Sequence, residues 1–142
     1  MSEKTERHGR CLCGAVSVSL PATSTTVGAC HCDMCRRWSG GPFLEIPGDP
    51  DTQFVGGDAI RVFNSSEWAE RGFCSICGTH LFYRLKATGQ HFIPVGLFDD
   101  TDGLEFAQEV FVDEQPHYYR FANDTKRLTG AELFALISGE ET

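Results

Sequence analysis

The sequence predicts a mainly β, mostly antiparallel fold, and three observations predict it. Short runs rich in β-branched and aromatic residues recur along the chain, separated by glycine, proline and aspartate turns roughly every 8–12 residues. A helical pattern is confined to the C-terminal end. Seven cysteines fall into three clusters, and bound metal ions would tie such short strands together.

Length and composition favour one globular domain over residues 1–142, with a flexible polar start at 1–9. The formal net charge of -8 argues against a nucleic-acid partner, which would require a basic patch. No apolar run approaches the roughly 20 residues that span a bilayer, so we expect no membrane partner. The charged start lacks the apolar core of a secretory signal, so we expect a cytoplasmic protein with reduced thiols.

The expected strands are short runs with period-two alternation or many apolar β-formers. They are 15–20, 43–46, 53–55, 60–63, 80–85, 91–97 and 109–112, with an extended segment over 66–73. A Ser/Thr-rich turn is expected over 22–28. Because Gly56-Gly57-Asp58 separates two of the runs, 53–55 and 60–63 are expected to form a hairpin.

The one helix expected lies at the C-terminus, over 131–137. Thr129 precedes it and Glu132 follows three residues later, which is the spacing of a capping box. Gly139 is a plausible end of the helix.

The two outer cysteine clusters predict one closed zinc site. Each is a short turn that brings two sulfurs to one ion, and a structural zinc takes four thiolates. The four expected ligands are Cys11, Cys13, Cys74 and Cys77.

The central cluster leaves three thiols, Cys30, Cys32 and Cys35. Three protein ligands with an open fourth position are typical of a catalytic zinc, so these cysteines are the expected catalytic centre. His31 could instead complete a closed site, although adjacent residues seldom bind one ion well. It could also act as an acid or base, orient a ligand, or lie at the surface. Disulfides are disfavoured by the odd count and the reducing compartment.

A basic pair, Arg36-Arg37, directly follows this central cluster. One interpretation is two solvated side chains. The other is a substrate-binding role, in which the two arginines lower thiolate pKa values or hold an anionic substrate.

Three motifs carry a resemblance to a known family. CLCGAV at 11–16, CHCDMCRRWSG at 30–40 and ERGFCSICGTHLFYR at 70–84 resemble, in order and spacing, the glutathione-dependent formaldehyde-activating enzymes, a family that includes the centromere protein V-like proteins. The resemblance covers Gly9 to about Tyr119. It implies stacked antiparallel sheets, the Mss4-like β-tent, and two zinc ions per chain. It places a structural zinc on Cys11, Cys13, Cys74 and Cys77 and a second zinc on Cys30, Cys32 and Cys35.

The resemblance also implies an activity. The family's founding reaction condenses formaldehyde with glutathione to S-hydroxymethylglutathione, which is classed with carbon–sulfur lyases. The implied partners are a small-molecule thiol and an aldehyde. A substrate thiol at the open position would lose its proton and add to the aldehyde carbonyl. Tyr118-Tyr119 stand where many members have a tryptophan, so the substrate-facing loop departs from the family pattern.

Two other classes of function remain open. One is a zinc-stabilised binding module without chemistry, because a fold does not fix its function. The other is a metal or redox sensor that uses the three central thiols. The number of bound zinc ions separates these classes from the enzyme.

Overall fold

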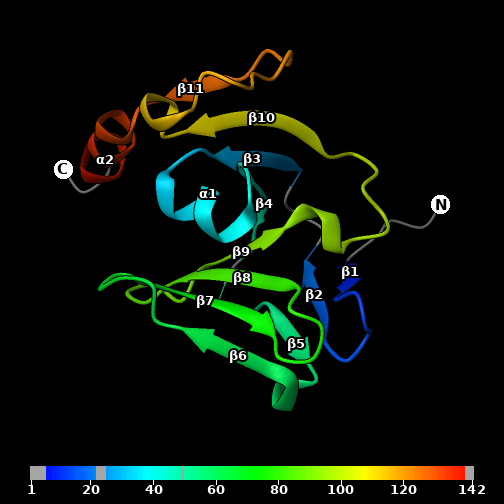
Figure 1. Cartoon of the computed structure of the whole chain (residues 1–142). Helices are drawn as coiled ribbons and strands as arrows, with labels where there is room; N and C mark the ends of the chain where they lie inside the picture. The colour runs from blue at the N-terminus through cyan, green and yellow to red at the C-terminus, as the bar shows by residue number, and fades with distance from the viewer. Residues whose placement is uncertain (1–5, 22–24, 49, 140–142) are drawn as a thin grey trace. The chain divides into compact units, whose positions relative to one another are not determined.

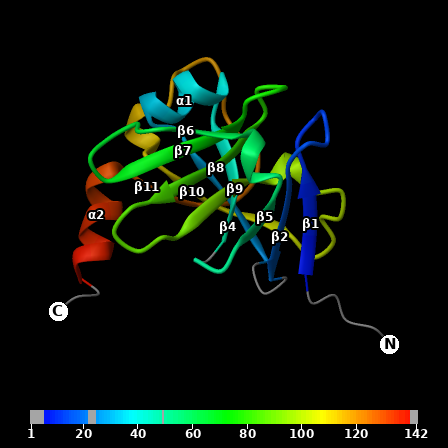
Figure 2. The same ribbon diagram turned by 90° about the horizontal axis from the view of Figure 1, so that it is seen from below.

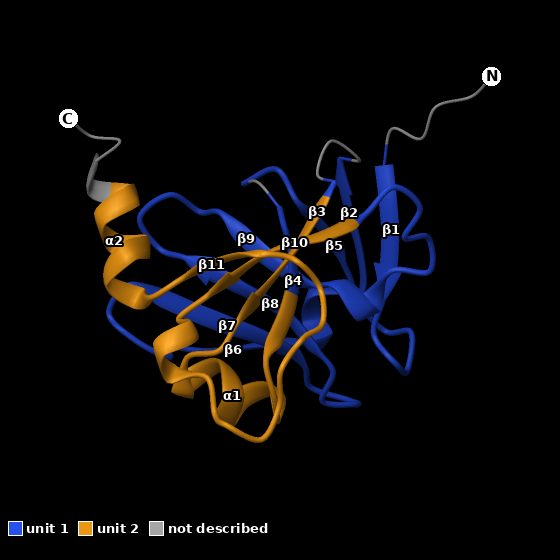
Figure 3. Ribbon diagram, turned by 90° about the horizontal axis from the view of Figure 1, so that it is seen from above, with its two compact units in different colours: residues 1–25, 45–104 blue, residues 26–44, 105–142 orange. Residues whose placement is uncertain are grey.

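The computed structural model describes residues 6–21, 25–48 and 50–139 (Figure 1). Within them the chain forms eleven strands, two α-helices and three 3₁₀ turns. The predicted mainly β class with a short C-terminal helix is confirmed. The chain divides into two compact units (Figure 3): unit 1 comprises residues 1–25 and 45–104, and unit 2 comprises 26–44 and 105–142. The single domain expected over 1–142 stays a prediction.

Unit 1 contains a three-stranded antiparallel sheet in which β2 (Ser17–Pro21) lies between β1 (Glu6–Arg10) and β5 (Gln53–Val55). Figure 2 shows β1 and β2 side by side. Val18 and Leu20 alternate with polar neighbours along β2 and are buried, as the period of a half-buried strand requires.

Unit 1 also contains an antiparallel ladder. Its strands, in spatial order, are β4 (Phe43–Pro47, through residues 45–47), β9 (His91–Pro94), β8 (His80–Leu85), β7 (Ala69–Cys74) and β6 (Ile60–Phe63). Ile46, Leu81 and Ile93 are fully buried on these strands. Two 3₁₀ turns connect elements of the unit, η1 (Gly57–Ala59) and η2 (Val95–Leu97).

Unit 2 is built on parallel pairs. Its elements are β3 (Thr26–Cys30), α1 (Asp33–Ser39), β10 (Glu105–Val110), η3 (Val112–Glu114), β11 (Lys126–Leu128) and α2 (Gly130–Gly139). β10 pairs in parallel with β3 on one side and with β11 on the other. The parallel arrangement brings the carboxyl ends of β3 and β10 together, since Cys30 lies opposite Val110.

The expected hairpin over 53–63 is wrong. β5 pairs with β2, and β6 pairs with β7. The turn η1 separates the two strands, and Gly56 before it has a left-handed φ of 94°. The Gly-Gly-Asp sequence therefore redirects the chain from one sheet to the next instead of closing a two-residue turn.

Three other expectations also differ from the structure. The expected flexible start overlaps β1, because residues 6–10 pair with β2; residues 1–5 lie outside the described residues. The expected turn over 22–28 is wrong for residues 26–28, which belong to β3; residues 22–24 lie outside the described residues. Helix α1 was not expected. It has only seven residues, too few for a clear helical period, and Gly40 ends it with φ of 80°.

The predicted C-terminal helix and its cap are confirmed. The Glu132 backbone N–H donates to Thr129 Oγ1 at 3.0 Å, and the Thr129 backbone N–H donates to Glu132 Oε1 at 2.8 Å. These reciprocal bonds are those of a capping box. Neither helix in the described part of the chain is long and apolar enough to cross a membrane.

The close approach at Gly56 generates a stability prediction. A Cβ at this position would lie 2.1 Å from the backbone oxygen of Ala15, and the positive φ disfavours any L side chain. We expect Gly56→Ala to lower the free energy of unfolding in urea by about 3 kcal/mol. Gly57→Ala is the control, because nothing lies within 4 Å of its Cβ position; it should change stability by less than about 0.5 kcal/mol. Equal stabilities of the two variants would contradict the described turn.

Candidate metal centres

The first centre is built from two turns of unit 1. Cys11 directly follows β1, and the Gly14 N–H donates to the Cys11 carbonyl at 3.1 Å. Cys74 ends β7, and the Gly78 N–H donates to the Cys74 carbonyl at 2.8 Å. Gly14 and Gly78 both have left-handed φ, near 80°, which closes each turn and turns two sulfurs to one side.

The four sulfurs of this centre have the spacing that zinc requires. The Sγ atoms of Cys11, Cys13, Cys74 and Cys77 all lie within 4.8 Å of one another. Cys11 Sγ and Cys13 Sγ are 3.6 Å apart, and Cys13 Sγ and Cys74 Sγ are 3.8 Å apart. A tetrahedron with zinc–sulfur bonds of about 2.3 Å has edges of about 3.8 Å. This donor set therefore fits a closed four-thiolate zinc site.

Hydrogen bonds to sulfur lower the pKa of Cys11 and Cys77, whereas desolvation and the neighbouring sulfurs raise the pKa of Cys13 to about 11. The Val16 N–H donates to Cys11 Sγ at 3.3 Å, and the Cys77 N–H donates to Cys74 Sγ at 3.5 Å. Thr79 Oγ1 lies 3.1 Å from Cys77 Sγ and accepts from the Leu12 N–H, so its own proton faces the sulfur. This hydroxyl lowers the pKa of Cys77 to about 5.

The second centre lies in unit 2, where β3 leads into α1. Cys30 is the last residue of β3, Cys32 is the N-cap of α1, and Cys35 lies in the first turn. The Cys35 N–H donates to Cys32 Sγ at 3.4 Å, so the cap itself draws the two sulfurs together. All three Sγ atoms lie within 4.8 Å of one another.

This three-sulfur group also fits a soft or borderline metal ion. Hydrogen bonds with the sulfurs of Cys32 and Cys35, together with burial and the repulsion between closely spaced thiolates, raise the pKa of Cys30 well above its usual range. A cation among them reverses that effect, as it does for coordinating thiols in general. Within the described residues the group consists of these three sulfurs alone.

His31 lies between two of the sulfur donors but is engaged elsewhere. Its side chain is fully buried, so the alternative of a surface histidine is wrong. Nε2 lies 2.8 Å from Glu109 Oε1, and Nδ1 lies 2.6 Å from the Tyr119 hydroxyl. With both ring nitrogens hydrogen-bonded, the imidazole is not available as a fourth ligand in this arrangement.

Glu109 links His31 to a wider network. The Thr125 hydroxyl donates to Glu109 Oε2 at 2.5 Å, and Arg127 donates to Oε1 at 2.8 Å. Burial acts to raise the pKa of Glu109, but the hydrogen bonds from Thr125 and His31 and the charge of Arg127 outweigh it and lower the pKa below 4.5. Gln115 accepts from Arg127 and donates to the Tyr119 carbonyl, both at distances near 2.9 Å.

The two arginines expected near substrate have different surroundings. Arg36 Nε donates to the His31 carbonyl at 2.9 Å, so this side chain holds the loop that carries the sulfurs. Arg37 is exposed and lies 3.8 Å from Asp33, one helical turn away. Their substrate-binding role stays a prediction.

Sequence reasoning missed Glu109, Tyr119 and Arg127 as parts of this site. A signal existed for Glu109, because it opens the strand-like run 109–112, and the structure buries it on β10. Tyr119 is the second residue of the pair at which the chain departs from the family pattern. The structure shows that its hydroxyl meets His31.

Fold and sites together define a class: a small, mainly β protein with two cysteine clusters suited to metal ions. Comparison with known families narrows the class. The sequence profile described as "Glutathione-dependent formaldehyde-activating enzyme" matches residues 6–114. The chain belongs to this family.

Curated relatives agree with this assignment. A protein of Schizosaccharomyces pombe, named an uncharacterized lyase, is 31% identical over 133 residues, which cover 93% of this chain and 97% of the relative. Two fungal proteins carry the family's name provisionally, and both are 29% identical. The protein of Podospora anserina matches over 54% of this chain and 38% of its own length, and that of Phaeosphaeria nodorum over 72% and 57%.

A solved structure supports the fold. A crystal structure of a Rhodobacter sphaeroides protein aligns with a TM-score of 0.59 and 19% identity, covering 72% of this chain and 98% of its own. At this identity the likeness concerns the fold alone.

The Thr79 hydroxyl generates a prediction on metal affinity. In a Cys35→Ser background, which retains the four-sulfur centre, we expect Thr79→Val to raise the zinc dissociation constant about tenfold, because the hydrogen bond to Cys77 is lost. Thr79→Ser keeps the hydroxyl and should match the parent. Competition with a chromophoric chelator measures both. Equal constants for the valine and serine variants would remove Thr79 from the metal centre.

Glu109 generates a pH-dependent prediction. We expect Glu109→Gln to lower the free energy of unfolding at neutral pH by about 3 kcal/mol, because it breaks a buried charged network. Since the pKa of Glu109 is lower in the folded chain than its ordinary 4.5, the carboxylate's stabilisation is present above pH 4.5 and is lost as the pH falls through the folded value.

The gap in stability between wild type and Glu109→Gln should therefore narrow as the pH falls below 4.5. Denaturant unfolding at a series of pH values measures it. Glu105→Gln is the control, because Glu105 is exposed on the same strand and should show no gap at any pH. If the difference in free energy of unfolding between wild type and Glu109→Gln stays constant down to acid pH, the ionised network around Glu109 is ruled out.

Proposed function

We propose that the chain is a zinc-dependent enzyme of the carbon–sulfur lyase type, which adds a thiol such as glutathione to formaldehyde or another aldehyde. Family membership and the lyase name of the yeast relative support a lyase-type function. The observation that carries the proposal is the three-sulfur group of Cys30, Cys32 and Cys35, held together within 4.8 Å and without a fourth protein ligand among the described residues.

The two cysteine groups would have different tasks. Cys11, Cys13, Cys74 and Cys77 would hold a structural zinc, and Cys30, Cys32 and Cys35 would hold the second zinc. Zinc bound at the second group would supply Lewis acidity and favour the thiolate form of a thiol substrate. A cytoplasmic location, where thiols stay reduced, suits both groups.

The proposed reaction is an addition that needs no oxidant or reductant. The sulfur electron pair of the thiol forms a bond to the carbonyl carbon of the aldehyde. The π electrons of the carbonyl move to its oxygen, and the proton lost from the thiol is taken up there. The product is the S-hydroxyalkyl thiol, and the reverse reaction cleaves the same carbon–sulfur bond.

Residues around the sulfurs hold them in place for this reaction. The His31 N–H donates to the Val110 carbonyl at 3.1 Å, and the His31 carbonyl accepts from Arg36. The imidazole is fixed between Glu109 and the Tyr119 hydroxyl. Because His31 lies directly between Cys30 and Cys32, these contacts fix the direction of both sulfurs.

The direct test replaces one ligand of each centre. Cys32→Ser should leave one bound zinc of two and reduce the catalysed rate of thiol–aldehyde condensation by more than about a hundredfold. Exchange spectroscopy by NMR with labelled formaldehyde and glutathione measures the rate, after subtraction of the uncatalysed reaction. Cys13→Ser is the matched control. It should lower thermal stability, while the part of the sample that remains folded keeps its condensation rate.

Condensation at the wild-type rate in a protein whose three-sulfur group has lost its zinc would reject the enzyme proposal. A wild-type protein with one tightly held zinc and no condensation would instead support a sensor or a zinc-stabilised binding module.

A further inference from the structure

Phe111 has an unusual backbone conformation directly after β10. Its φ is 57° and its ψ is 42°, and among the described residues it is the one residue other than glycine with a positive φ. An L side chain, above all a bulky one, disfavours this left-handed region. Such a conformation persists only where the surrounding structure holds it, and it is often found beside functional sites.

Helix α2 holds the side chain of Phe111. The ring of Phe134 packs edge to face on it, with ring centroids 6.0 Å apart and an interplanar angle of 84°. Gly130, at the start of α2, leaves the space that the ring occupies, since a Cβ there would lie 2.6 Å from Phe111 Cε1. The Gly130 N–H also donates to Asp113 Oδ1 at 2.9 Å. The helix therefore holds the turn through a ring and through a carboxylate.

The same turn holds the segment of the second cysteine group at two backbone amides. The Val110 carbonyl accepts from the His31 N–H at 3.1 Å. Glu114 Oε1 accepts from the Asp33 N–H at 2.9 Å. The Glu114 N–H donates to the Phe111 carbonyl at 3.0 Å, which links the two acceptors through the left-handed residue. The two amides belong to the residues on either side of the N-cap of α1, whose sulfur is one of the three donors.

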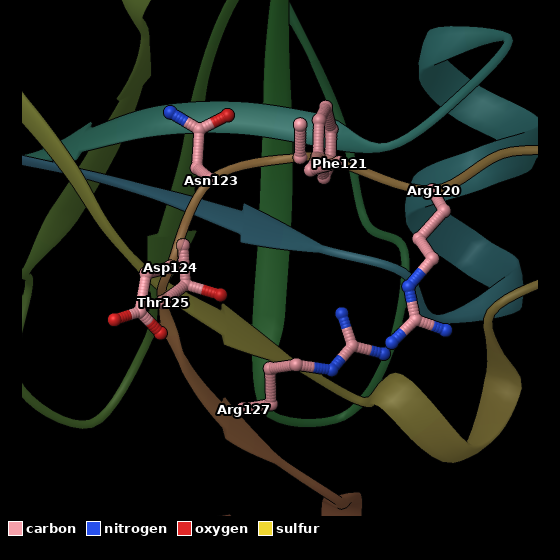
Figure 4. Close-up of a pocket in the computed structure, with 7 residues that line it drawn as sticks. Arg120, Phe121, Asn123, Asp124, Thr125 and Arg127 are labelled. Atoms are coloured by element: carbon pink, nitrogen blue, oxygen red, sulfur yellow. The ribbon is translucent and has the colours of Figure 1, made fainter.

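The imidazole of His31 is held separately, by side chains outside α2. Glu109 Oε1 lies 2.8 Å from His31 Nε2, and Thr125 and Arg127 donate to the same carboxylate. Thr125 and Arg127 line a pocket of about 580 Å³ in the same unit (Figure 4). Loss of the α2 contacts would therefore leave the imidazole in place and release the backbone on the other side of Cys32.

We propose that α2 positions the second cysteine group. The ring of Phe134 keeps Phe111 in its left-handed conformation. This conformation keeps Glu114 on the amide of Asp33, so that the N-cap sulfur of α1 stays beside the other two sulfurs of its group. The inference rests on the proposed function for one point, that the group binds zinc. Phe134 and Glu114 are positioning residues, since they act through the backbone of the cysteine segment.

The first test measures zinc affinity in the full chain. We expect Phe134→Ala to raise the dissociation constant of the second zinc about tenfold, because the ring contact that holds the turn is lost. The first zinc should be held as in wild type. Competition with a chromophoric chelator measures both constants, and the phase of zinc release that is missing in Cys32→Ser identifies the second zinc. Leu136→Ala is the matched control, because it removes an exposed apolar side chain from roughly the opposite side of the same helix; both constants should stay unchanged.

A second variant displaces the same ring without weakening α2. Gly130→Ala places a methyl group where the ring of Phe111 lies, while alanine is the better helix former. We expect this variant to weaken binding of the second zinc, as Phe134→Ala does. An effect in both variants separates the position of the ring from the stability of the helix.

A conservative variant tests the contact made by Glu114. Glu114→Ala removes the acceptor of the Asp33 N–H and should raise the dissociation constant of the second zinc about fivefold. Glu114→Gln keeps an oxygen that can accept the same hydrogen bond, and it should bind zinc as wild type does. Equal constants for the alanine and glutamine variants overturn the inference.

Amide exchange tests the positioning without reference to zinc. The Asp33 N–H should exchange with deuterium about tenfold faster in Phe134→Ala than in wild type, because its acceptor is released. The Cys11 N–H, which donates to the Val16 carbonyl in unit 1, is the internal reference and should exchange at an unchanged rate. Exchange of the Asp33 amide at the wild-type rate overturns the inference.

The inference and the proposed function can fail separately. If wild type binds only one zinc, the proposed function fails, and the exchange rate of the Asp33 amide decides whether α2 holds the cysteine segment. If wild type binds two zinc ions and catalyses condensation, while Phe134→Ala and Gly130→Ala hold the second zinc as tightly as wild type, the proposed function stands and α2 does not position the group.

Discussion

The structure depends on the close packing of cysteine sulfurs. In unit 1 a single cluster joins turns whose cysteines are 61 residues apart, Cys13 and Cys74, with their sulfurs 3.8 Å apart. Thiolates at this distance repel one another, and a metal cation turns that repulsion into attraction. Because the closure spans so much chain, it restricts the unfolded state strongly. A metal ion bound by these sulfurs would therefore hold the ends of β1 and β7 together.

The second group of sulfurs, Cys30, Cys32 and Cys35, is stabilised in a different way. Its three donors come from one short segment, so a metal ion there closes no long loop of the chain. It is held instead by contacts that His31 makes with β10 and with the segment around Tyr119. The buried Glu109 is central, because it binds His31, Thr125 and Arg127 together. Through Arg127 the same carboxylate is also linked to Gln115.

The sequence could predict the contacts that short spacing dictates, and it could not predict those made across long separations. CxC and CxxC turns bring their own sulfurs together, so ligand counting leads to the two groups that the structure shows. The capping box at Thr129 is equally local. In contrast, His31 meets Glu109 and Tyr119 at separations of 78 and 88 residues, which no local pattern encodes. The expected hairpin was wrong for the same reason: the partners of β5 and β6, not the turn between them, decide their pairing.

We propose that the chain holds two zinc ions, one in each group of sulfurs. The most direct measurement is anomalous scattering from crystals of the purified protein, recorded on both sides of the zinc absorption edge. We expect two peaks, one among Cys11, Cys13, Cys74 and Cys77 and one among Cys30, Cys32 and Cys35. A single peak in the first group, with a disulfide between two sulfurs of the second, would contradict it.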